Sequence, residues 1–191
     1  MRHSPFTVVY DACVLYPAPL RDLLMHLALT GAYRARWSAQ IHDEWTRNLL
    51  LNRPDLTPEQ LTRTVTCMNN AIPDCLVTGH EPLVAGLDLP DADDRHVLAA
   101  AIKCNASVIV TYNLKDFPAA ILDGFDIEAL HPDIFLSDIW DLDQAAMLLA
   151  VQNQRASLKH PPQTARELLD TLLQAQLPET VKQLSTFELL I

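Results

Sequence analysis

The sequence predicts an α/β domain with a mainly parallel central sheet flanked by helices, followed by an α-helical C-terminal extension. Two short runs of β-branched, apolar and aromatic residues, 6–10 and 107–111, are typical of buried strands. The stretches between such runs carry apolar residues at helical spacing, and alternating strands and helices favour βαβ units with parallel strands. Both runs end at polar residues, where parallel sheets carry their functional groups.

The first part of the chain has clear helix boundaries. Apolar residues recur at helical spacing over 20–29, and a second strand is expected over 33–38. Ser38 is a suitable N-cap for a helix that runs to about residue 52. A capping-box sequence at 57–60 then predicts a helix that ends near residue 71, just before a proline.

The following segments complete the predicted sheet. Residues 75–77 are a candidate third strand, and residues 79–90 are expected to form a loop. Small apolar residues over 97–102 indicate a compact helix that can pack closely on the sheet. A fifth strand is expected around residues 125–128.

After about Pro132 the pattern becomes entirely helical. We expect helices over 136–154, 164–173 and 178–190, separated by proline-containing segments. We therefore divide the chain into a core of residues 1–131 and a helical C-terminal extension of residues 132–191.

Composition excludes several classes of protein. With 20% charged and 49% hydrophobic residues, the chain is not expected to be disordered. No apolar run approaches the ~18–20 residues that cross a bilayer, and the one at 6–10 is too short for a signal peptide, so we expect a cytoplasmic protein without a membrane partner. The four glycines form no phosphate-binding loop, and the four cysteines form no CxxC pair.

The charge balance argues against a protein that holds nucleic acid by bulk electrostatics. The chain has 14 basic and 24 acidic residues, a formal net charge of −10. Residues 1–116 contribute −3, from 10 basic and 13 acidic residues, and residues 117–191 contribute −7, from 4 and 11. Most of the acid excess therefore lies in or near the helical extension.

Four acidic residues stand at the start or end of predicted elements, roughly one for each βα step: Asp11, Glu44, Asp94 and Asp116. Taken singly, Asp11 and Asp116 could each cap a turn, Glu44 could be a solvated helix residue, and the acids of 91–94 could cap a helix. Together they are more specific. Clustered carboxylates without a His/Cys set are typical ligands of Mg²⁺ or Mn²⁺ and favour metal-assisted phosphodiester hydrolysis.

Four segments, 9–13, 38–44, 91–101 and 110–117, resemble the PIN domain. The specific motifs are D-x-x-D-R-H-V-L-A-A-A, from Asp91, and T-x-N-x-x-D-F, from Thr111. The resemblance covers about residues 6–131, is strongest to the VapC-like toxins of bacterial type II toxin–antitoxin modules, and implies a PIN-like fold. It matches the family's metal-binding acids to Asp11, Glu44, Asp94 and Asp116.

The resemblance also implies supporting residues. Thr111 and Asn113 match the polar residues that hold the acid cluster together, and Asp91 is an extra acid that would bind the metal directly or through water. Arg95 and Lys115 adjoin proposed ligands, so we expect them to contact RNA phosphates.

The function that the resemblance implies is that of a Mg²⁺- or Mn²⁺-dependent endoribonuclease that hydrolyses RNA with a metal-activated water. Such toxins usually cut tRNA or another structured RNA, form homodimers and are neutralised by a cognate antitoxin. The helical extension exceeds the usual short toxin, which leaves the dimer geometry and the antitoxin docking open.

Three other functions are alternatives. A phosphatase with an aspartyl nucleophile at Asp11 would need an aspartate where Cys13 stands. A housekeeping RNA-processing nuclease would have the same site, and an inactive PIN scaffold would bind RNA or protein without cutting. His96, two residues after Asp94, is interpreted as a helix residue near the site rather than a general base.

Overall fold

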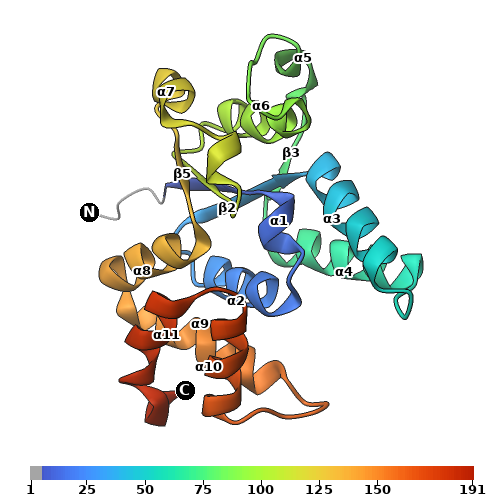
Figure 1. The fold of residues 1–191 in the computed structure, drawn as a ribbon. Coiled ribbons are helices and arrows are strands. Elements are labelled where there is room, and N and C mark those ends of the chain that lie inside the picture. The colour runs from blue at the N-terminus through green and yellow to red at the C-terminus, as the bar shows by residue number, and fades with distance from the viewer. Residues whose placement is uncertain (1–5) are drawn as a thin grey trace. The chain divides into compact units, whose positions relative to one another are not determined.

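The structure is a computed structural model that describes residues 6–191 (Figure 1). The chain forms two compact units. The first contains the chain up to Tyr16 together with Tyr33–His131, and the second contains Pro17–Ala32 together with Pro132–Ile191. The division into residues 1–131 and 132–191 stays a prediction.

The first unit is built on one parallel sheet, which confirms the predicted fold class. Its strands follow the order β3-β2-β1-β4-β5, and every neighbouring pair is parallel. Their bounds are β1 Thr7–Tyr10, β2 Arg34–Ser38, β3 Leu76–Val77, β4 Val108–Val110 and β5 Glu128–Leu130. All residues of β1 and β4 are buried, as expected for central strands covered on both faces.

The strands on one side of β1 are formed first, and those on the other side follow later in the chain. From β1 the chain moves outward through β2 to β3, and it then returns to the other side of β1 to form β4 and β5. This arrangement is a topological switch point, and in open parallel sheets ligands bind at such a point, beyond the carboxyl ends of the two strands. The residues that follow β1 and β4, beginning at Asp11 and Thr111, therefore lie at this point.

The helical segments of the first unit connect these strands. They are α1 Ala12–Leu15, α3 Ala39–Asn52, α4 Pro58–Ala71, α5 Glu81–Val84, η1 Ala92–Asp94, α6 Arg95–Lys103, η2 Leu114–Asp116, α7 Ala119–Leu122 and η3 Asp123–Phe125. Helix α6 packs on β1, β2 and β4, and its alanines at 99–101 are fully buried, so small side chains bring this helix close to the sheet.

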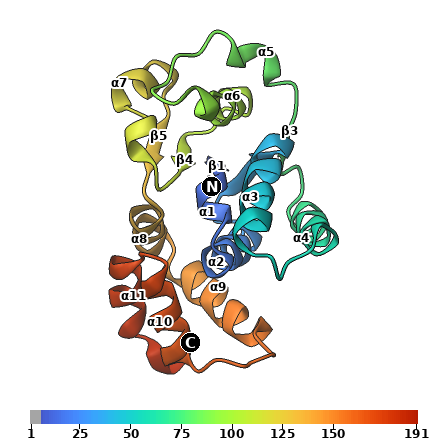
Figure 2. The same cartoon turned by 45° about the vertical axis from the view of Figure 1, so that its right-hand side comes forward.

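The second unit is helical. It consists of α2 Ala18–Leu29, α8 Pro132–Leu142, α9 Gln144–Ser157, α10 Ala165–Gln174, α11 Pro178–Ser185 and η4 Glu188–Leu190. Helix α2 lies alongside α9 (Figure 2), and α8 packs against α11. No helix among residues 6–191 combines the length and the apolar character that a membrane crossing requires.

The structure corrects two helices of the extension. The helix predicted over 136–154 is two helices, because the Asp143 carboxylate accepts a hydrogen bond from the Ala146 backbone N–H (2.9 Å) and starts α9 as its N-cap. The helix predicted over 178–190 ends at Ser185 and is followed by the separate turn η4.

Two predictions in the core were also wrong. The loop predicted over 79–90 contains the short helix α5, which begins at Glu81. The strand expected around 125–128 begins only at Glu128, because η3 occupies Asp123–Phe125 and Asp126 takes a left-handed conformation with φ 56°. Aspartate tolerates that conformation better than most residues, so a tight turn ends there and the strand follows it.

Candidate active site

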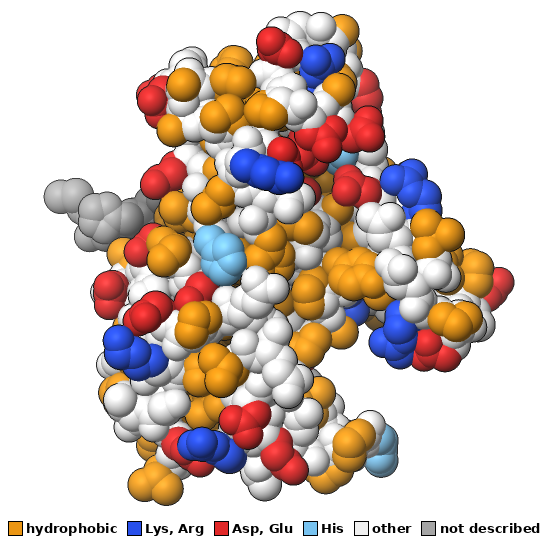
Figure 3. Space-filling view, viewed as in Figure 1, with side chains coloured by type: hydrophobic (Ala, Val, Ile, Leu, Met, Phe, Trp, Pro, Cys, Tyr) orange, Lys and Arg blue, Asp and Glu red, His pale blue; other side chains and the backbone are white. Residues whose placement is uncertain are grey.

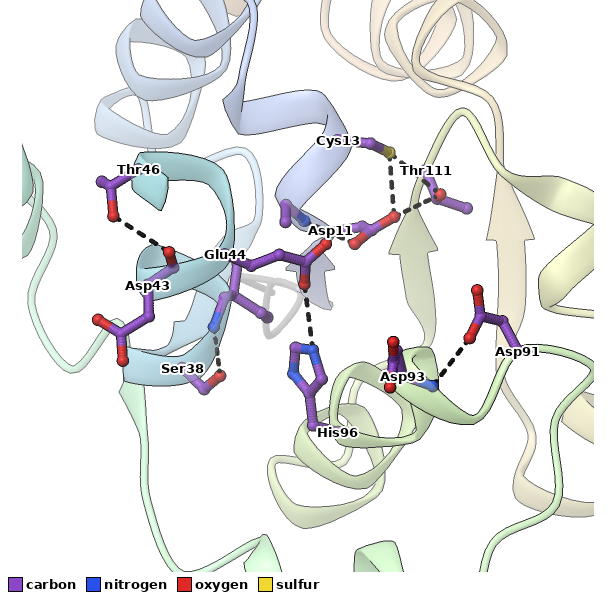
Figure 4. A network of polar contacts seen from close by, with 12 residues as sticks. Asp11, Cys13, Ser38, Asp43, Glu44, Thr46, Asp91, Asp93, His96 and Thr111 are labelled. Carbon is purple, nitrogen blue, oxygen red and sulfur yellow. Dashed lines mark hydrogen bonds and ion pairs between the residues drawn. The ribbon is translucent and has the colours of Figure 1, made fainter. Parts of the chain in front are cut away.

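Asp11 lies at the carboxyl end of β1 and is only 1% exposed. Its Oδ1 accepts a hydrogen bond from the Ala12 backbone N–H (2.6 Å), and its Oδ2 accepts from the Cys13 thiol (3.0 Å) and the Thr111 hydroxyl (2.7 Å). Asp11 thus caps α1 while its carboxylate is held at the switch point (Figure 4). Burial raises the pKa of Asp11, the hydrogen bonds from Cys13 and Thr111 oppose that rise, and the nearby charge of Glu44 adds to it.

Thr111 links the two central strands. It follows β4, is fully buried, and donates to Asp11 from across the switch point. Its hydroxyl also accepts a hydrogen bond from the Asn113 backbone N–H at 2.9 Å. Asn113 therefore contacts Thr111 through its backbone.

Asp94 is close enough to four other acids for their charges to affect its pKa. It ends η1 at the start of α6 and is 8% exposed. Burial raises its pKa to about 7, and the negative charges of four other acids contribute, in decreasing order those of Asp11, Asp91, Asp116 and Glu44. The fold thus brings five acids from separate parts of the chain within electrostatic reach of one another.

Glu44 reaches this cluster from α3. Its Oε2 lies 3.2 Å from Nε2 of His96, a residue of α6 that is 3% exposed. Figure 4 shows the Glu44 side chain between Asp11 and His96, whereas the neighbouring Asp43 points away from them. Asp91 lies at the start of η1, where its carboxylate accepts the Asp93 backbone N–H (2.9 Å), so it is both a cap and a member of the cluster.

The donor set suits a hard divalent cation. Among residues 6–191, no three or more His, Cys, Asp or Glu side chains are arranged so that they could hold a metal ion as they stand. Burial raises the pKa of Asp94, the charges of the neighbouring acids add to that rise, and a divalent cation bound beside them would oppose it. Carboxylate oxygens are the ligands that Mg²⁺ and Mn²⁺ favour, so these residues fit such an ion.

The two basic residues chosen from the sequence differ in their surroundings. Arg95 is half-buried, and its Nη2 lies 3.3 Å from the highly exposed carboxylate of Asp88. Lys115 is exposed on η2. In Figure 3, acidic side chains gather in one patch near α5 and α6, and Lys or Arg side chains lie on either side of it.

Sequence reasoning missed the contacts of Cys13 and His96. The Cys13 thiol donates a hydrogen bond to Asp11 and accepts one from the Tyr112 backbone N–H at 3.2 Å. Burial raises the pKa of Cys13 well above its usual value, so it remains a thiol that can donate. The sequence feature that could have indicated these contacts is spacing, because Cys13 and His96 each follow a site aspartate by two positions.

Comparison with known proteins agrees with this geometry. Residues 7–115 match the PIN domain model, and residues 132–186 match the model of the VapC50 C-terminal domain. A protein of Mycobacterium tuberculosis (strain ATCC 25618 / H37Rv), described as "Putative ribonuclease VapC50", is 40% identical over 107 residues. The aligned region spans 56% of this chain and 63% of that protein, which is less than two thirds of its length.

No solved structure matches the chain. The PIN model alone covers more than half of the sequence, and it includes three of the four acids singled out above together with Asp91. The resemblance on which the site was predicted is therefore confirmed. The chain belongs to the PIN domain family, as a VapC-like member with a C-terminal extension.

Proposed function

We propose that this protein is an endoribonuclease that depends on Mg²⁺ or Mn²⁺. One observation supports the proposal: burial raises the pKa of Asp94 to about 7, and the charges of the neighbouring acids Asp11, Asp91, Asp116 and Glu44 add to that rise. A divalent cation bound there would lower the pKa of water and offset the negative charge that develops on a phosphodiester during hydrolysis.

Each residue has a distinct part in the proposed reaction. Asp11, Asp94 and Asp116 would hold the cation, Glu44 would bind it or orient the attacking water, and Asp91 would bind it directly or through water. The hydroxyl of Thr111 keeps the Asp11 carboxylate in a fixed orientation. The proposal also assigns RNA phosphate contacts to the exposed Lys115 and to Arg95, which can exchange its exposed partner Asp88 for a phosphate.

We further infer that the protein acts as the toxin of a type II toxin–antitoxin pair. The match to a relative described as a ribonuclease, and the match of residues 132–186 to the VapC50 C-terminal domain, support this assignment. The proposed substrate is tRNA or another structured RNA, the proposed partners are a cognate antitoxin and a second copy of the chain, and the proposed location is the cytoplasm. The acid excess of the C-terminal part suits contact with a basic partner rather than with RNA.

Cleavage of a labelled structured RNA tests the nuclease proposal. The purified chain should cut in Mn²⁺ or Mg²⁺, and chelation with EDTA should stop the reaction. Asp11→Asn should lower the rate on the order of 100-fold or more, because it removes a charged ligand. Asp43→Asn is the matched control, since Asp43 is exposed and directed away from the cluster. Equal rates for wild type and Asp11→Asn would refute the assignment.

Two further measurements separate the alternative functions. Calorimetric titration that detects no Mn²⁺ binding at millimolar concentration would favour an inactive scaffold. Expression without an antitoxin should arrest growth if the protein is a toxin, and growth arrest should be absent in the Asp11→Asn strain. Unimpaired growth with an active enzyme would favour a housekeeping RNA-processing nuclease.

A further inference from the structure

His96 makes a specific contact with the acid cluster that its helix position alone does not require. It lies on α6 two residues after Asp94, and its Nε2 is 3.2 Å from the carboxylate of Glu44 on α3, 52 positions away in the chain. Its side chain is 4% exposed, whereas that of Glu44 is 30% exposed. A buried and rigid imidazole therefore holds a longer, partly solvated carboxylate.

The hydrogen bond has a defined direction. An ionised carboxylate only accepts hydrogen bonds, so Nε2 of His96 carries the hydrogen and donates it to Glu44. Among the described residues 6–191, Nδ1 of His96 has no hydrogen-bond partner. The bond to Glu44 is thus the polar contact that sets the orientation of this ring.

Glu44 needs such a partner because its neighbours repel it. Burial raises the pKa of both Asp11 and Asp94, and the negative charge of Glu44 adds to each rise. A glutamate has several side-chain torsions, and like charges favour the rotamers that turn it toward solvent. The His96 N–H opposes that movement and links α3 to the helix that begins at Asp94.

We propose that His96 is a positioning residue that keeps the Glu44 carboxylate directed into the metal site. This inference rests on the proposed metal-dependent function with Glu44 as a ligand of the cation, and it assigns to His96 neither metal ligation nor proton transfer. Side chains that orient a metal ligand in this way typically change metal affinity about 10–100-fold when they are replaced. His96 should therefore act on metal affinity, and it should do so only through Glu44.

Mn²⁺ affinity of the purified full chain, measured by calorimetry, tests this role without relying on catalysis. His96→Gln places an amide N–H the same number of bonds from Cβ as Nε2, so it should bind Mn²⁺ within about threefold of wild type. His96→Asn is also polar but one methylene shorter, and His96→Met has no donor. Both should bind at least about 10-fold more weakly.

A matched control and a double mutant isolate the contact. The control is His42→Met. His42 is also buried but lies on α3, where it forms hydrogen bonds with Trp45 and Asn69 rather than with Glu44. Its replacement should leave the Mn²⁺ affinity unchanged. In a Glu44→Ala background, His96→Asn should cause no further loss, because the group on which His96 acts is gone. Circular dichroism verifies that each variant is folded.

The outcomes separate this inference from the proposed function. If wild type binds Mn²⁺ and His96→Asn binds equally well, the positioning role is wrong while the metal site stands. An equal loss in His42→Met, or an additive loss in the Glu44→Ala background, would show a general structural effect and would also refute it. If wild type binds no Mn²⁺, the proposed function fails and the inference fails with it.

Discussion

At the scale of single residues, the site is governed by the balance between burial, like charges and hydrogen bonds. Asp11 and Asp94 are both buried acids, but only Asp11 is held by three hydrogen bonds to its carboxylate. Asp94 experiences burial and four neighbouring negative charges, which raise its pKa to about 7. Asp94 is therefore the position at which the acid cluster opposes folding most directly when no cation is bound.

We expect Asp94→Asn to stabilise the metal-free protein at alkaline pH. Because the pKa of Asp94 is higher in the folded chain than its usual value of 3.8, ionisation costs stability progressively as the pH rises from about 4 to 7. In EDTA at pH 8 the asparagine variant should gain on the order of 1–2 kcal/mol in unfolding free energy, after allowance for solvent screening. The gain should be smaller at pH 5. Urea unfolding at both values measures it, and equal stability at pH 8 would contradict the charge argument.

Thr111→Val should impair Asp11 through a lost hydrogen bond. The Thr111 hydroxyl lowers the pKa of Asp11 and also accepts the Asn113 N–H. Its removal should raise the pKa of Asp11, move the acidic limb of the pH–rate profile to higher pH, and cost about 1–3 kcal/mol of stability. Thr111→Ser retains the hydroxyl and should restore both properties. An unchanged acidic limb in the valine variant would argue against this role.

At the scale of elements, a buried aspartate in the helical unit stabilises the start of another helix. Asp133 of α8 is 5% exposed and accepts hydrogen bonds from the backbone N–H groups of Glu179 (3.0 Å) and Thr180 (2.9 Å) and from the Thr180 hydroxyl (2.7 Å). These N–H groups belong to the first turn of α11, where intrahelical partners are missing. A residue distant in sequence thus performs the capping function that is usually local.

Asp133→Ala should therefore destabilise α11 specifically. It removes the acceptor of two backbone N–H groups and leaves the Thr180 hydroxyl with only a 3.4 Å contact to the backbone carbonyl oxygen of residue 133, at an expected cost of about 2–4 kcal/mol. Hydrogen exchange of the α11 amides should increase more than that of the sheet. Asp138→Ala is the control, because Asp138 lies on the same helix but is exposed. A uniform increase over the whole chain, or none, would contradict this assignment.

At the scale of the whole molecule, the two units are not consecutive in the sequence. Helix α2 comes from the N-terminal part of the chain, but it belongs to the helical unit and packs against α9. The Gln154 side chain of α9 donates to the Pro19 carbonyl at 2.8 Å and reinforces this contact. The chain therefore passes from β1 to β2 by way of α2, a helix that belongs to the other unit.

We expect a fragment of residues 1–131 to be less stable than the full chain. It retains α2 but lacks α9. Full exposure of each leucine that α9 covers would cost about 1.5–3 kcal/mol of folding free energy. Thermal unfolding should occur at lower temperature, and sedimentation should reveal self-association through the uncovered face. Replacing the exposed Leu51 on α3 with serine should not alter either property of the full chain. A monomeric fragment with unchanged stability would show that the α2–α9 contact is dispensable.

The errors of the sequence predictions have local physical causes. The pattern of apolar residues continues from α8 into α9, so periodicity alone does not reveal that Asp143 caps a new helix. The apolar residues at 125 and 127 resemble a strand, but the left-handed Asp126 lies between them. Short elements such as α5 bury few apolar side chains and leave little pattern to detect.

The amino-acid pattern predicts the α/β class and four of the five strands correctly, and it also predicts which acids form the site. Hydrophobic periodicity, helix caps and polar residues at strand ends are local properties, and each can be recognised from neighbouring residues. The fold was needed to reveal that His96 contacts Glu44, that Cys13 and Thr111 share Asp11, and that α2 belongs to the helical unit. Those contacts join residues far apart in the chain, and they depend on strand order and helix packing, for which a single sequence carries no local signal.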